Sequence, residues 1–171
     1  MEKTMCLSAA MKLLRSLDEE KSEILGKERE NSSYQVVSGI EADPPDYDFA
    51  ATQSQLEKLD ETVCNIRHAI NQANATRPVG DTGFTVDQIL ISMAQMNSRL
   101  AVLQSMSQKP KKSQPRFMGA LESQSVVVHT NYDPDEIKTC YRKLREKISN
   151  LQMALDLHNL STNITFEVLV E

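Results

Sequence analysis

The sequence has little glycine and few aromatic residues: its 171 residues include five Gly, no Trp, four Tyr and four Phe. β-Sandwiches, barrels and doubly wound sheets usually contain more turn glycines and more large aromatic side chains than this. The composition therefore argues against those classes and favours a mainly helical fold. A chain of this length can bury a core without disulfide bonds.

Cysteine spacing and apolar runs give no sign of export or of a membrane. The three cysteines, Cys6, Cys64 and Cys140, are odd in number and far apart, which argues against a disulfide framework and a CxxC zinc site. The longest apolar stretch near the N-terminus, residues 7–11, is too short for a signal-peptide core or a membrane span. We therefore expect a reduced, cytoplasmic protein without a membrane partner.

Charge and motif content exclude several function classes. Acidic residues outnumber basic ones by 24 to 19, so we expect no nucleic-acid partner. The dinucleotide-binding GxGxxG, P-loop, GxSxG and HExxH patterns are all missing from the sequence. We therefore predict no catalytic residue, no metal site, no cofactor and no enzymatic activity.

Apolar residues recur at alternating steps of three and four, which is the spacing of an amphipathic helix. The longest such series is Phe49, Thr52, Leu56, Leu59, Val63, Ile66, Ile70 and Ala73. Two further series run over residues 86–103 and 137–155, and a weaker one lies near the N-terminus. We predict a mainly α protein, an antiparallel long-helix bundle or set of coiled-coil hairpins, with about four helices and a few short strands.

Local chemistry marks where the helices begin. Thr85 with Gln88 forms a capping-box pattern, Asp133 followed by Pro134 is typical of a helix start, and Asp46 or Asp48 opens the second helix. We predict a single domain over residues 1–171, with helices over about 4–29, 48–74, 86–107 and 134–159.

Three short runs have strand character. Residues 34–37, 125–130 and 163–170 are rich in β-branched residues, and residues 109–124 are predicted to form a linker because they contain two prolines and a glycine. The long fourth helix separates the last two runs, so they cannot pair with each other if it is straight. We expect the final strand to pair with another subunit, which predicts a homo-oligomer.

Polar residues gather where helices two and four end and helix three begins. The resulting candidate cluster, a site for a small ligand or cation, consists of Asn71, Asn74, Thr76, Thr85, Asp87, Asp156 and Asn159. The alternative interpretation is that these side chains satisfy unpaired backbone groups at helix ends. His158 continues the apolar stripe of the last helix, so we predict a buried, hydrogen-bonded histidine and not a ligand-binding one.

Four segments, LEKLDETVCNIRHAINQANATR, TVDQIL, NYDPDEIKTCYRKL and LQMALDLHNLSTNITFEV, together resemble a group of bacterial helical proteins that includes members called septicolysins. The resemblance covers most of the chain from Tyr47 onward. It implies long helices and an oligomeric protein, and it supplies no established biochemical activity.

The first functional hypothesis is a non-enzymatic, self-associating helical scaffold or interaction protein whose protein partner is not identified. One alternative is a protein that binds a small ligand or cation through the polar cluster. A second alternative, suggested by the septicolysin name alone, is a membrane-active protein.

Overall fold

The computed structural model describes residues 1–39, 41, 44–113 and 127–169. Long helices dominate this part of the chain, which confirms the predicted mainly α fold class. The elements are β1 (Glu2–Cys6), α1 (Leu7–Asn31), α2 (Phe49–Thr76), η1 (Gly80–Thr82), α3 (Val86–Ser107), β2 (Lys112–Ser113), β3 (Val128–His129), α4 (Pro134–Ser161) and β4 (Asn163–Glu167).

The chain divides into two compact units, which are described separately. Unit 1 comprises residues 1–77 and 157–171, and unit 2 comprises residues 78–156. Most of α4 belongs to unit 2, and its last residues belong to unit 1. The single domain over residues 1–171 stays a prediction.

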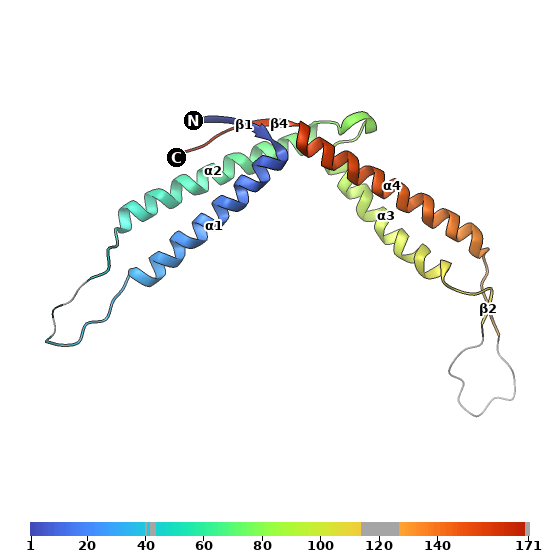
Figure 1. Ribbon diagram of the computed structural model, residues 1–171, viewed down its shortest axis with the longest axis horizontal. Helices are drawn as coiled ribbons and strands as arrows, with labels where there is room; N and C mark the ends of the chain where they lie inside the picture. Colours follow the sequence, from blue (N-terminus) through green and yellow to red (C-terminus); the bar gives the residue numbers. More distant parts are fainter. Residues whose placement is uncertain (40, 42–43, 114–126, 170–171) are drawn as a thin grey trace, which may run out of the picture. The chain divides into compact units, whose positions relative to one another are not determined.

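In unit 1, α1 and α2 form a hairpin beside a two-stranded sheet (Figure 1). Three side-chain contacts join the helices: Asp18 with Arg67, Lys21 with Asp60, and Glu28 with Gln53. The residue numbers rise along α1 while they fall along α2. The two helices are therefore antiparallel. β1 pairs antiparallel with β4, with Met5 opposite Ile164 and Lys3 opposite Phe166.

The core of unit 1 lies where the hairpin meets the sheet. Leu7 of α1 and Leu59 and Ile66 of α2 have no exposed surface. Alternate residues of β4 point into the same core, because successive side chains of a strand face opposite sides. The buried core residues near the C-terminus are Ile164 and Phe166 of β4 and Val168, which follows the strand.

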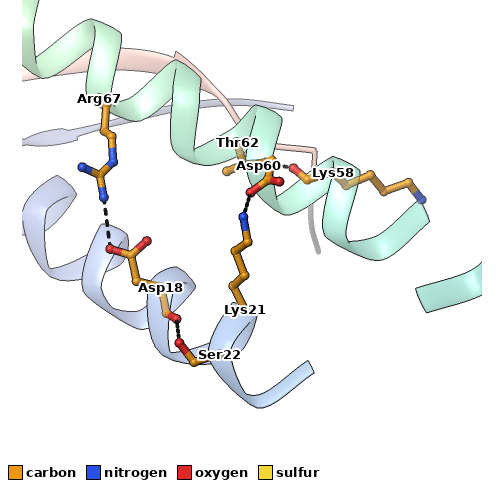
Figure 2. A network of polar contacts seen from close by, with 7 residues as sticks. All are labelled: Asp18, Lys21, Ser22, Lys58, Asp60, Thr62 and Arg67. Carbon is orange, nitrogen blue, oxygen red and sulfur yellow. Dashed lines mark hydrogen bonds and ion pairs between the residues drawn. The ribbon is translucent and has the colours of Figure 1, made fainter. Parts of the chain in front are cut away.

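Figure 2 shows two ion pairs that join α1 to α2. The Arg67 guanidinium lies 3.2 Å from the Asp18 carboxylate, and the Lys21 ammonium contacts the Asp60 carboxylate. All four side chains are a third or more exposed, so each pair contributes at most about 1 kcal/mol. The pairs therefore select the register of the hairpin more than they stabilise it.

A buried hydroxyl fastens the segment after β4 to α2. Thr62 has no exposed surface; its hydroxyl donates to the Lys58 carbonyl oxygen at 2.8 Å and accepts from the Leu169 amide at 3.0 Å. The hydroxyl therefore both donates and accepts in a site closed to solvent, where an unpaired hydroxyl would be costly.

In unit 2, α3 and α4 lie side by side and form a second hairpin (Figure 1). The buried core of this unit combines the residue before η1, one stripe of α3 and one residue of α4. Its members are Val79, Val86, Ile89, Met93, Met96 and Leu155. Leu144, Ile148 and Leu151 of α4 are partly buried against them. The Tyr132 hydroxyl donates to the Met106 carbonyl oxygen and joins the other end of the hairpin.

The predicted starts of α2, α3 and α4 are confirmed. The Thr85 hydroxyl accepts from the Gln88 amide, and the Gln88 side-chain oxygen accepts from the Thr85 amide, which completes the capping box. Asp48 caps α2 by accepting from the Ala51 amide at 3.0 Å. Pro134 is the first residue of α4.

The first strand is a correction to the sequence analysis. Residues 4–6, predicted as helix, belong to β1, and α1 begins at Leu7. The final strand ends at Glu167 and pairs with β1 of the same chain, a partner that the sequence analysis did not predict. Pairing of β4 with another subunit stays a prediction. β1 satisfies the backbone groups along one edge of β4.

Two other strand predictions also change. Residues 34–37 form no strand; Tyr34, Val36 and Val37 are at least half exposed, and β-branched residues alone do not make a strand without a partner. Of residues 125–130, the structure shows only the short β3, which pairs with β2 inside the predicted linker. Residues 114–126 lie outside the described part of the chain.

Candidate functional site

The seven residues of the predicted polar cluster are divided between the two units. Unit 1 holds Asn71, Asn74, Thr76 and Asn159, and unit 2 holds Thr85, Asp87 and Asp156. Several make bonds local to a helix: Thr76 donates to the Gln72 carbonyl, Thr85 caps α3, and Asp156 accepts from the Gln152 amide group. The Thr85 bond matches the helix-end interpretation, whereas the Asp156 bond joins two side chains. A ligand site at this cluster stays a prediction.

His158 is buried and hydrogen-bonded, as the sequence analysis predicted. Its side chain is 6% exposed, and its Nδ1 lies 3.2 Å from the Thr162 hydroxyl. Burial lowers the pKa of the imidazole below its ordinary value of 6.5, and the nearby positive charge of Arg77 lowers this pKa further. The folded protein therefore holds His158 neutral at neutral pH.

This burial predicts a loss of stability in mild acid. The unfolded chain protonates His158 near pH 6.5, whereas the folded chain protonates it only at lower pH. The stabilisation is complete above pH 6.5 and is lost as the pH falls through the folded-state pKa. We expect the melting temperature to fall over this window and His158→Gln to flatten that fall. The matched control is His68→Gln, which replaces an exposed histidine of α2.

The composition of α3 differs from that of α1. Only two of the 22 residues of α3, Asp87 and Arg99, are charged. Eleven of the 25 residues of α1 are charged, counting Lys, Arg, Asp and Glu. A helix on the surface of a globular protein normally carries charged residues on its solvent side, whereas a helix apolar all round is normally buried. The side of α3 that faces away from α4 therefore requires an explanation.

That side, which we call the outer face of α3, is exposed and apolar. At 100° per residue it lies opposite the buried stripe of Ile89, Met93 and Met96. Its large members, Leu90, Ile91 and Val102, are 54%, 58% and 59% exposed. The outer face consists of Leu90, Ile91, Ala94, Ser98, Ala101, Val102 and Ser105, with Asp87 at its N-terminal end.

The outer face is missing from the sequence analysis, although the sequence carries a signal for it. The three-and-four spacing selects the stripe through Ile89 and Met93, because that series is the more regular one. A second apolar stripe on the same helix, combined with the near absence of charge, would have indicated a helix covered on two sides.

In the described ranges, no group of three or more His, Cys, Asp or Glu side chains lies close enough to hold a metal ion. Cys6, Cys64 and Cys140 are free thiols. Each helix among the described residues is too short or too polar to traverse a lipid bilayer.

Comparison with known proteins informs the fold alone. No protein-family model matches the chain, and no curated protein matches it. The structure is similar to the crystal structure of a functionally unknown conserved protein from Corynebacterium diphtheriae, with a TM-score of 0.59 and 15% sequence identity. The match covers 95% of this chain and 99% of that one, so the two proteins share a fold over nearly their whole lengths.

Proposed function

We propose that this protein is a self-associating helical interaction protein and that its copies pack together through the outer face of α3. The observation that carries the proposal is the exposure of Leu90, Ile91 and Val102 on a helix with two charged residues. Removing such side chains from water is worth roughly 25 cal/mol per Å² of apolar area. Burying the outer face against a partner of matching shape would therefore stabilise the complex.

The chemistry of the outer face favours a second copy of the chain as the partner. A two-fold interface brings one patch against itself, so like charges in the patch would face each other across it. The outer face carries one charged residue, Asp87, at its N-terminal end, so an antiparallel two-fold pairing would keep the two Asp87 carboxylates at opposite ends of the interface. Its small members, Ala94, Ser98 and Ala101, would let two helices approach closely, with the larger residues packing on either side.

Two further parts of the proposal follow from the sequence. The proposal includes a non-enzymatic role and a relationship to the septicolysin-like proteins. The resemblance to those proteins implies an oligomer, which agrees with self-association. A cytoplasmic location is supported by the three free thiols, of which Cys64 and Cys140 are exposed.

The proposal is tested by the oligomeric state of a charged variant. Wild-type protein at about 100 µM is expected to sediment as a dimer or larger species, and Leu90→Lys is expected to raise the dissociation constant at least about tenfold, because the ammonium would be desolvated at the interface. The same side chain is already 54% exposed in the single chain, so the helices should form normally. Analytical ultracentrifugation with far-UV circular dichroism measures both properties.

The matched control is Leu160→Lys. Leu160 is 65% exposed and lies near the end of α4 in unit 1, outside the outer face of α3. This variant should keep the wild-type sedimentation coefficient. A wild-type protein that remains monomeric at about 100 µM, or equal dissociation by both variants, would remove the outer face from the proposal.

A further inference from the structure

Unit 2 contains a hollow beside the first turns of α3, on a different side of this helix from its outer face. The hollow has a volume of about 200 Å³ and is lined by Phe84, Gln88, Ile89, Ser92, Lys147 and Leu151. Its residues come from the segment before α3, from α3 and from the facing part of α4. All six belong to unit 2, so one compact unit builds the whole hollow.

The apolar part of the lining comes from three residues. Ile89 is 1% exposed and belongs to the core of unit 2, and Leu151 is partly buried against that core. Phe84 is 56% exposed, so its ring has apolar area that a ligand could cover. A hydrocarbon group in the hollow would cover the exposed ring and rest on the two aliphatic side chains.

The polar part of the lining consists of hydrogen-bond donors. The Gln88 side-chain oxygen is occupied by the Thr85 amide, so the NH₂ end of the same amide carries its free hydrogen-bonding capacity. Ser92 has a hydroxyl group that can donate, and Lys147 has an ammonium group with donors only. In the described part of the chain, neither Lys147 nor Gln88 pairs with a carboxylate.

The hydrogen-bond donors of Gln88, Ser92 and Lys147 favour a negatively charged ligand. Three donors, one of them cationic, complement a group that only accepts hydrogen bonds, and an ionised carboxylate is such a group. The one acidic residue of the adjoining hollow, Glu146, does not line this one, although the two hollows share Lys147 and Leu151. A cationic or neutral headgroup would leave the Lys147 charge unmatched.

We propose that this hollow binds a small amphipathic monocarboxylate, with the carboxylate at Lys147, Gln88 and Ser92 and the hydrocarbon part against Phe84, Ile89 and Leu151. Its volume of about 200 Å³ lies below the range of about 300–1,000 Å³ that holds drug-sized ligands. The ligand is therefore a medium-length acyl or aryl acid and not a long lipid. The inference does not depend on self-association through α3.

Isothermal titration of the full-length protein with octanoate tests the headgroup. Octanoate is expected to bind with a dissociation constant of about 1 mM or tighter, and octanol, which has the same chain without the charge, at least about tenfold more weakly. Equal binding of octanol and octanoate would overturn the proposal, as would the absence of octanoate binding at about 10 mM.

Variants of two lysines on α4 test the position. Lys147→Met keeps the aliphatic stem and removes the charge, so octanoate binding should weaken at least about tenfold. Lys147→Arg should stay within about threefold of wild type, because the charge remains. Lys143→Met is the matched control, because Lys143 lies one helical turn away and does not line this hollow. Unchanged binding by Lys147→Met, or equal weakening by Lys143→Met, would overturn the assignment. Circular dichroism checks that each variant keeps its helices.

Discussion

Replacing Leu59 with alanine is expected to lower the free energy of unfolding of unit 1 by about 2–5 kcal/mol. Leu59 has no exposed surface and lies on α2 at the centre of the core that α1 and β4 complete. Truncation removes the transfer free energy of three carbon atoms and leaves a cavity that rigid helices cannot close fully. Leu59→Asp should abolish folding of the unit, because it buries a carboxylate without a partner.

Native-state hydrogen exchange measures this effect in the right unit. Peptides from α2 and β4 report the opening of unit 1, whereas peptides from α3 report unit 2. Leu160→Ala is the matched control, since Leu160 belongs to unit 1 and is 65% exposed; its effect should stay within about 0.5 kcal/mol. Equal protection in Leu59→Ala and Leu160→Ala would contradict the assigned core.

Replacing Phe166 with alanine is expected to destabilise unit 1 by about 3–5 kcal/mol. Phe166 is 5% exposed in β4 and packs in the same core as Leu7 and Ile66. Its loss removes the largest side chain with which the sheet covers the α1–α2 hairpin. We therefore expect lower exchange protection in β1 as well as in β4, because each strand has the other as its hydrogen-bonding partner.

The control for this prediction is Glu167→Ala, at the neighbouring exposed position of β4. It should change stability by no more than about 0.5 kcal/mol. Pairing within one chain also predicts that the protection of β4 does not depend on protein concentration. Protection that rises with concentration would show that β4 pairs between chains, contrary to the structure.

The sequence by itself determined the four long helices and the starts of the last three. The three-and-four spacing from Leu56 to Ala73 predicts the buried stripe of α2, since that period follows from local helix geometry. Thr85, Asp48 and Pro134 mark helix starts for an equally local reason, because a cap acts on backbone groups two or three residues away. The burial of His158 is also predicted from the sequence, because this residue continues the apolar stripe of α4.

Only the tertiary structure decided which segments meet. β1 and β4 are joined by contacts such as Thr4 with Thr165, 161 residues apart, and no local pattern in residues 2–6 announces a partner at that distance. The same holds for the outer face of α3 and for the hollow at Lys147, which exist because α4 covers one side of α3 and leaves another open. Helix formation depends on neighbours in sequence, whereas strand pairing and surface exposure depend on neighbours in space.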